Sequence, residues 1–235
     1  MKINIAELNI DIASRGKYIE KLCEKYVAAF DSADINIDVT SSDVKAELNA
    51  TEYQFSADYC EATAVYRKIG YRLPEFNAFI LHGATFRFED RGIALVAASG
   101  TGKSSHMQNW IKLYGEKVEI INGDKPIIRI KDGKPFAFGT PWCGKENLSS
   151  NDSVELTDIC FIVRGKENKT SLLQDENIIS RLLSQVVIPR GSGNIIKTLD
   201  LIEQMLKKCR IWEIKCTADV SSAKVSSKAI LNVSK

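Results

Sequence analysis

The stretch that decides the fold is ALVAASGTGKSSHMQNW, residues 94–110. A short apolar run leads into a loop of small residues that ends in Gly-Lys-Ser, and a helical pattern follows. A glycine-rich loop between a strand and a helix holds phosphate groups, because its backbone N–H groups and the helix N-terminus present positive charge. The stretch therefore predicts an α/β protein built around a phosphate-binding loop.

In a loop of this Walker A type, each residue has its own role. Glycines let the backbone amides turn inward as an anion nest, the lysine reaches the β- and γ-phosphates, and the following serine hydroxyl binds Mg²⁺. The predicted nucleotide-binding residues are Ser99, Gly100, Thr101, Gly102, Lys103, Ser104 and Ser105. Ala97 stands where the pattern GxxxxGK[ST] has its first glycine, but the inner glycines are intact and we expect the site to survive. The alternative is a small-residue turn that contains Gly-Lys-Ser by chance.

The pattern of strands and helices around this loop predicts two units. Alternation predicts strands over 2–10 and 35–39, and helical spacing predicts a helix over 17–30. We therefore assign residues 1–75 to a small α+β N-terminal subdomain, and residues 76–235 to a nucleotide-binding core with a mixed sheet and flanking helices.

Composition and charge exclude several classes of protein. The 235 residues carry 32 basic and 30 acidic side chains without a block of one sign, which argues against a nucleic-acid binder. No apolar run approaches the roughly 18 residues that cross a bilayer, so no membrane association is expected. The first residues alternate like a strand rather than a signal peptide, and the six cysteines have no paired spacing. We expect a cytoplasmic protein with reduced thiols.

Two further residues could complete a catalytic site. Asp124 follows the apolar strand predicted at 118–123, one crossover after the loop, where an acid can hold the metal or its water. A solvated aspartate in a turn is the alternative. His82, in ILHGATF, ends an apolar strand next to a glycine, although a lone histidine is more often structural. His106, in the first turn of the loop's helix, is expected to pack or to face solvent.

Together these motifs resemble the catalytic domain of HPr kinase/phosphorylase, and more broadly the HPr-kinase-like proteins. The resemblance rests on the His82-Gly83 pair, a β-turn-β unit, Ser-Gly-Thr-Gly-Lys-Ser and the acid after the next strand, and it covers roughly residues 75 to 215. The segment FGTPWCGKENLSSND, residues 138–152, is similar to a loop of the wider kinase-like group. Its alternative role is a rigid turn with Trp142 in the core. The Ser-Gly-Thr-Gly-Lys string is also similar to ATP-dependent phosphoenolpyruvate carboxykinase, which implies a P-loop core of that type.

The resemblance implies a kinase that uses ATP and Mg²⁺ to phosphorylate a hydroxyl, on a Ser or Thr of a protein or peptide or on a small molecule. It implies catalytic roles for His82, Asp124 and Lys103, and metal binding by Ser104 and Asp124. Gly123 replaces one of two adjacent acids of HPr kinase/phosphorylase, which puts the phosphorylase activity in doubt. A nucleotide-binding regulatory or scaffold protein with little catalysis therefore remains the alternative. A homo-oligomer is compatible with the resemblance, and Arg164 and Arg190 are candidates for an assisting cation, with a surface role as the alternative.

Overall fold

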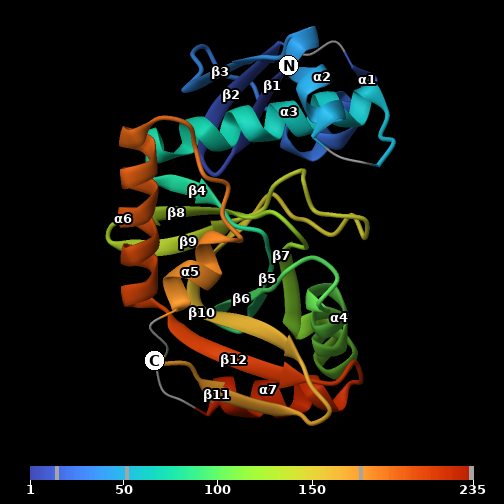
Figure 1. Cartoon of the computed structure of the whole chain (residues 1–235), viewed down its shortest axis with the longest axis vertical. Helices are drawn as coiled ribbons and strands as arrows, with labels where there is room; N and C mark the ends of the chain where they lie inside the picture. The colour runs from blue at the N-terminus through green and yellow to red at the C-terminus, as the bar shows by residue number, and fades with distance from the viewer. Residues whose placement is uncertain (14–15, 51–52, 175–176, 233–235) are drawn as a thin grey trace.

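A computed structural model describes residues 1–13, 16–50, 53–174 and 177–232. They form a small three-stranded sheet near the N-terminus and a larger mixed sheet, with helices packed around both (Figure 1). The predicted α/β class with a mixed sheet and flanking helices is confirmed. Within this part of the chain, no helix is long and apolar enough to cross a membrane.

The small sheet has the order β1–β2–β3 and buries one face under a helix. Its strands are β1 (Lys2–Ile5), β2 (Leu8–Ala13) and β3 (Ile35–Asp38), with β1 antiparallel and β3 parallel to β2. Alternating isoleucines of these strands pack against α3 (Ala57–Arg72), since successive side chains of a strand point to opposite faces. Two short helices, α1 (Lys17–Leu22) and α2 (Ser41–Asn49), lie against α3. The short 3₁₀ turns η1 (Glu24–Tyr26) and η2 (Leu73–Phe76) follow α1 and α3.

The larger sheet is centred on β10. Its strands are β4 (Ala78–Ile80), β5 (Gly83–Phe88), β6 (Arg91–Val96), β7 (Val118–Asn122), β8 (Ile127–Lys131), β9 (Lys134–Phe138), β10 (Ser153–Arg164), β11 (Lys169–Leu172) and β12 (Arg210–Cys216). The start of β10 pairs antiparallel with β9, which leads on to β8 and β4. The rest of β10 lies between the parallel strands β6 and β12. Beyond β6 come the antiparallel strands β5 and β7.

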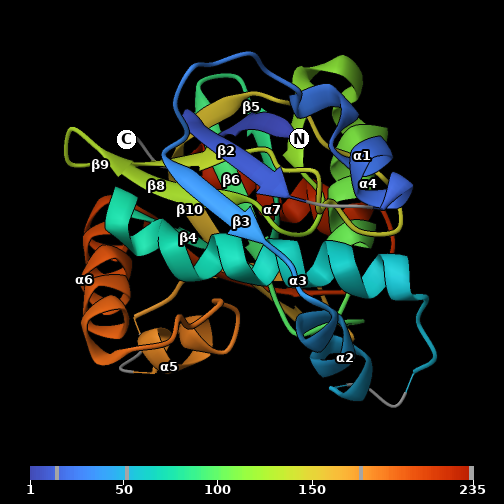
Figure 2. The same ribbon diagram turned by 90° about the horizontal axis from the view of Figure 1, so that it is seen from above.

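Helices cover both faces of the strands around β10. The four helices are α4 (Lys103–Tyr114), α5 (Ile178–Leu183), α6 (Ser192–Lys208) and α7 (Ser221–Leu231). On β6, Ile93 and Leu95 pack towards Trp110 of α4, whereas Val96 packs in the cluster that contains Met205 of α6. Figures 1 and 2 show α4 and α6 on opposite sides of the sheet. Because both faces are covered, these strands are apolar on both sides, as in other parallel sheets.

The structure corrects two of the predicted elements. Residues 2–10 are not one strand, because Ala6 and Glu7 have φ of 54° and 59° and turn the chain into a hairpin. The helix predicted over 17–30 ends at Leu22, followed only by the short turn η1. Past that turn, Val27 forms a bridge with Ile3, so pairing with β1 replaces further helical turns.

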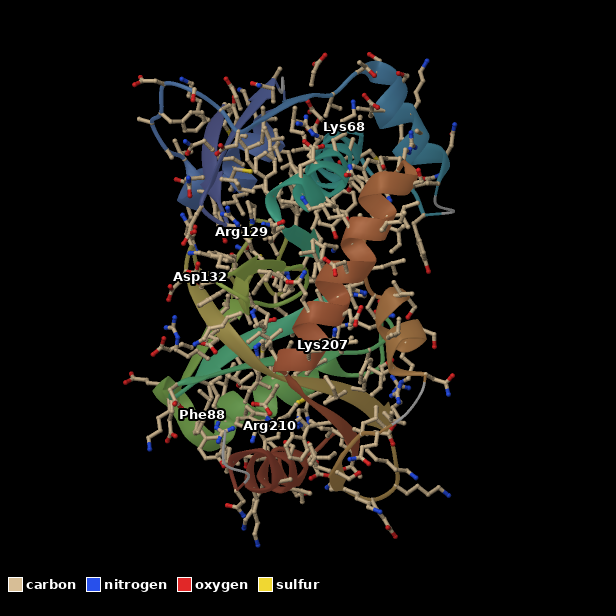
Figure 3. All side chains as sticks on the ribbon, turned by 90° about the vertical axis from the view of Figure 1, so that its left-hand side faces the viewer. Lys68, Phe88, Arg129, Asp132, Lys207 and Arg210 are labelled. Carbon is tan, nitrogen blue, oxygen red and sulfur yellow. The ribbon has the colours of Figure 1, made fainter. Side chains whose placement is uncertain are left out.

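The two sheets are joined through a shared hydrophobic cluster. Ile80, Ile127 and Phe138 of the larger sheet pack in the same cluster as the isoleucines of the small one. Arg129 lies at this junction, where its guanidinium donates a hydrogen bond of 2.6 Å to the Ala6 carbonyl (Figure 3). The boundary near residue 75 remains a prediction, since the packing is continuous across it.

Candidate functional site

The glycine-rich loop, residues 97–102, joins the end of β6 to the start of α4. Gly100 and Gly102 have φ of 75° and 125°, a region that only glycine adopts readily. No atom lies within 4 Å of the place where a Cβ would stand at either glycine. Within the described residues, nothing accepts a hydrogen bond from the amides of these two glycines. Ala97, in contrast, has no positive φ, so the missing first glycine does not strain the loop.

Lys103, the first residue of α4, folds back beneath this loop. Its side-chain amine donates a hydrogen bond of 2.8 Å to the Ala97 carbonyl and lies 3.3 Å from Nε2 of His82. The residue is only 7% exposed. This burial lowers the pKa of Lys103 below its usual value; the nearby Asp124 opposes the shift and Lys125 adds to it. The amine is thus held between the Ala97 carbonyl and the His82 ring.

Backbone pairing between two connections brings His82 next to Asp124. The chain before β5 bonds to the chain after β7, with the Gly83 amide 2.8 Å from the Asp124 carbonyl. The imidazole Nε2 of His82 then lies 3.2 Å from Oδ1 of Asp124. Burial alone would raise the pKa of Asp124, but the His82 hydrogen bond and the Lys125 charge outweigh it and lower the pKa to about 2. Asp124 is therefore a carboxylate at neutral pH.

One nitrogen of His82 thus faces both a donor and an acceptor. When Nε2 carries a proton it can donate to Asp124, and when it does not it can accept from Lys103. The two contacts hold the imidazole between a cation and a carboxylate.

Three residues of this site were not predicted from the sequence: Lys125, Asn122 and Thr140. Lys125 forms an ion pair with Asp124 through its Oδ2 atom. Asn122 is fully buried, and its Oδ1 accepts hydrogen bonds from the amides of Asp124 (2.9 Å) and Lys125 (2.6 Å). Its Nδ2 donates to the carbonyl and hydroxyl oxygens of Thr140. Asparagine before Gly-Asp favours such a side-chain turn, and this was the only sequence signal available.

The segment 139–150, which contains GTPWCGK, packs over the turn at Asp124. A Cβ on Gly123 would lie 2.9 Å from the Cys143 carbonyl oxygen, so the segment occupies the space that a second acid would need. Gly144, with φ of 81°, approaches the Asp124 side chain from the same segment. Trp142 turns the other way: its ring packs against Tyr66, and its indole N–H donates to the Ala62 carbonyl of α3. Trp142 therefore has a packing role, while Gly144 faces the candidate site.

The remaining candidates separate into near and distant residues. The Ser104 hydroxyl, in the first turn of α4, has no hydrogen-bond partner in the part of the chain described. Arg164 donates hydrogen bonds to the carbonyls of Gly100 and Thr101, so it braces the loop from the side of β10. Arg190 instead lies over the ring of Tyr71, on α3.

His106 has the packing role that was one of its two expected alternatives. Burial lowers the pKa of His106 to about 4, so it is neutral at pH 7. Its ring nitrogens contact the hydroxyls of Ser226 and Ser222 on α7, at 3.0 and 3.3 Å. His106 therefore joins α4 to α7 and does not belong to the site.

Comparison with known proteins adds little to this geometry. No protein-family model matches the chain, and no curated protein matches it. Among solved structures, the HPr(Ser) kinase/phosphatase from Coxiella burnetii is similar with a TM-score of 0.30 and 10% sequence identity, over 53% of this chain and 93% of that one. A similarity this low carries no argument about function, which rests on the residues described above.

Proposed function

We propose that the chain is a kinase that uses ATP and Mg²⁺ and transfers the γ-phosphoryl group to a hydroxyl. One observation carries the proposal: Nε2 of His82 lies 3.3 Å from the amine of Lys103 and 3.2 Å from the carboxylate of Asp124, beside a glycine-rich loop with open amides. A cation, a carboxylate and a proton acceptor at one point are the groups that phosphoryl transfer to a hydroxyl requires.

The chain's own residues divide the work of binding, charge stabilisation and proton transfer. The amides of the glycine-rich loop and the N-terminus of α4 bind phosphate oxygens. Lys103 and Lys125 stabilise negative charge on the transferred group. His82 takes the proton of the acceptor hydroxyl at Nε2 in the form in which that nitrogen is unprotonated, and Asp124 then accepts a hydrogen bond from the new N–H and stabilises the charged ring. Asn122 holds Asp124 and Lys125 in one turn, so both stay directed at the same place.

The residues present fit Mg²⁺ bound together with a nucleotide. The described residues contain no group of three or more His, Cys, Asp or Glu side chains that could hold a metal ion alone. Mg²⁺ needs no such group at a phosphate site, because one or two protein ligands and the phosphates with water complete its shell. Ser104 and Asp124 would be those protein ligands. Bound there, the ion would neutralise charge on the phosphates.

A regulatory protein that binds the nucleotide without turnover is the alternative, and Gly123 is the observation that favours it. With that position closed by the Cys143 carbonyl, Asp124 is the one carboxylate at the turn. The two functions differ in a measurable way, since only a kinase moves the labelled phosphate to an acceptor.

The experiment combines nucleotide binding with a search for the acceptor. Titration calorimetry would measure Mg-ATP binding to the wild type, to Lys103→Ala and to Lys112→Ala, an exposed lysine in the last turn of α4 that serves as a control. We expect Lys103→Ala to weaken binding by about a hundredfold, since a charge-assisted contact to phosphate is lost. The control should bind as the wild type does.

The same proteins would then be incubated with γ-labelled ATP and a lysate of the source cell, and the labelled species identified by mass spectrometry. The wild type should label an acceptor that Lys103→Ala does not. Equal Mg-ATP affinity in both proteins would refute the phosphate site. Tight binding without a labelled acceptor would replace the kinase with the regulatory alternative.

A further inference from the structure

A cavity of about 290 Å³ lies beside the glycine-rich loop, on the side away from His82 and Asp124. The loop itself, the first two turns of α4 and the segments that follow β10 and β12 form its walls. The order of strands in the sheet is β7–β5–β6–β10–β12, so the loop after β6 separates this cavity from the candidate catalytic residues. In size it falls near the lower end of small-molecule pockets, roughly 300 to 1,000 Å³.

The position of the cavity follows from the parallel part of the sheet. β6, β10 and β12 run in the same direction, so their carboxyl ends meet at one edge. In sheets of this kind, ligands bind in the crevice outside those ends. Here the crevice opens directly onto Gly100, Thr101 and Gly102 of the glycine-rich loop, and the amides of the two glycines have no partner among the described residues. A ligand that filled it could therefore continue into the loop.

We propose that this cavity binds the nucleoside part of the nucleotide, and that Asn109 selects adenine over 6-oxo purines. The inference rests on the proposed function, since the phosphates would lie in the glycine-rich loop. The nucleoside would enter between Arg164 on one side and the segment 216–218 on the other. The planar guanidinium of Arg164 is suited to stacking on a base.

Selection of the base follows from the fixed orientation of the Asn109 amide. Its Nδ2 donates to the carbonyls of Ala218 (3.0 Å) and Asp219 (2.9 Å), and these two bonds use both hydrogens of the amide nitrogen. Only the acceptor Oδ1 of this cavity-lining side chain remains for a ligand, and it has no partner among the described residues. The 6-amino group of adenine can donate to Oδ1, whereas the 6-oxo group of hypoxanthine or guanine cannot.

Two other polar side chains of the cavity wall, His106 and Thr217, are already engaged within the protein. Both ring nitrogens of His106 contact serine hydroxyls of α7. The Thr217 hydroxyl and amide bond to Asn168, and the hydroxyl also bonds to Asp219. The hydroxyls of Thr101 and Ser105 also line the cavity, but a hydroxyl both donates and accepts, so it would not distinguish a 6-amino from a 6-oxo group. We therefore assign discrimination between bases to Asn109, whose free oxygen only accepts.

The test compares three probes by titration calorimetry with Mg²⁺: ATP, ITP and inorganic tripolyphosphate. ITP differs from ATP at the 6-position of the base, and tripolyphosphate lacks the nucleoside. Wild-type protein should bind ATP about tenfold more tightly than ITP, the effect of one hydrogen bond. In Asn109→Ala, the affinities for ATP and ITP should differ by no more than about threefold.

Ala218→Trp places a large side chain in the cavity without changing the glycine-rich loop. It should weaken ATP binding at least about tenfold and leave tripolyphosphate binding unchanged. Ala46→Trp, at an exposed position of α2, is the control. If Ala218→Trp fails to fold, the affinities of the wild type for ATP and ITP still test the nucleoside site.

Equal wild-type affinity for ATP and ITP, or normal ATP binding by folded Ala218→Trp, would overturn the nucleoside site while tripolyphosphate binding upheld the phosphate loop. If neither ATP nor tripolyphosphate bound, the proposed function would fail and this inference with it.

Discussion

Replacing Asp124 with asparagine should destabilise the protein at neutral pH and do so much less in acid. Asp124 is the anion among three basic side chains, with His82 at 3.2 Å, Lys125 in an ion pair, and Lys103 close enough for their charges to interact. Asparagine keeps the shape of the side chain but removes the charge. The substitution therefore isolates the electrostatic contribution of the site to folding.

The magnitude follows from the pKa of Asp124. Burial opposes ionisation, but the contacts with His82 and Lys125 prevail and lower the pKa from 3.8 to about 2. Each pKa unit corresponds to about 1.4 kcal/mol, so the charge contributes about 2 kcal/mol to the free energy of unfolding at pH 7. Because the Asp124 side chain is only 20% exposed, solvent screens this contribution little.

The pH dependence has a definite sign. A carboxyl whose pKa is lower in the folded state stabilises the protein above its unfolded pKa, and the stabilisation is lost as the pH falls through the folded value. The difference between wild type and Asp124→Asn should therefore be about 2 kcal/mol at pH 7, about 1 kcal/mol at pH 3, and close to zero near pH 2.

Urea unfolding followed by circular dichroism at pH 7 and pH 3 measures this difference. Asp132→Asn is a suitable control, because Asp132 is exposed in the turn between β8 and β9 and has a positive φ that asparagine tolerates (Figure 3). The control should match the wild type within about 0.5 kcal/mol at both pH values. A loss in Asp124→Asn that is equal at the two pH values would refute the electrostatic explanation, as would no loss at pH 7.

Three more predictions concern the proposed base, the packing of the segment over Asp124, and the thiols. His82→Gln should slow phosphoryl transfer by about a hundredfold or more in single-turnover assays, because the proton acceptor is gone, while the Kd for Mg-ATP stays within about threefold. Gly139→Ala should lower the free energy of unfolding by about 2 kcal/mol or more in urea titrations, because its Cβ would lie 1.7 Å from the Ser150 carbonyl oxygen. All six cysteines are free and buried, and burial raises the pKa of Cys23 to about 12, so a thiol reagent should modify them slowly in native protein and fully in denaturant.

Each of these predictions has an outcome that contradicts it. Unchanged transfer by His82→Gln would remove histidine from the base role, and a parallel loss of ATP affinity would make it a binding residue. Gly193→Ala is the matched glycine control, because the structure leaves open space at that position in the first turn of α6; it should stay within about 1 kcal/mol of the wild type. Rapid modification of several thiols in native protein would show that the core is less closed than described.

Much of the local structure followed from short-range signals in the sequence. The Asp132-Gly133 pair between two apolar runs is a sequence signal for a hairpin turn, and both residues have the positive φ that such a turn needs. The loop of residues 97–102 leads from a strand to a helix as expected. The capping pair Thr40 and Asp43 is a sequence signal for the start of α2, a helix that was not predicted. The exposed edge strand β11 shows no clear alternation of apolar and polar residues, so its sequence does not predict a strand.

The candidate site was predictable only in part, because its members lie far apart in the chain. Lys103 was predicted from its motif, Asp124 from its place after the strand that follows the loop, and His82 mainly from a resemblance to a family. Nothing local indicated that Lys125 would pair with Asp124, or that Asn122 and Thr140 would hold the turn. Arg164 was a candidate for assisting transfer, and the structure shows its guanidinium bonded to the carbonyls of Gly100 and Thr101.

The sequence alone therefore determined the class of fold and the loop at its centre, since backbone φ preferences, the period of apolar residues and turn chemistry all act over a few residues. Only the tertiary structure decided which side chains meet. His82 reaches Lys103 because β5 and β6 are neighbours, and the crevice near Asn109 exists because β10 and β12 end beside β6. Such contacts depend on the order of strands in the sheet, which no short stretch of the chain specifies.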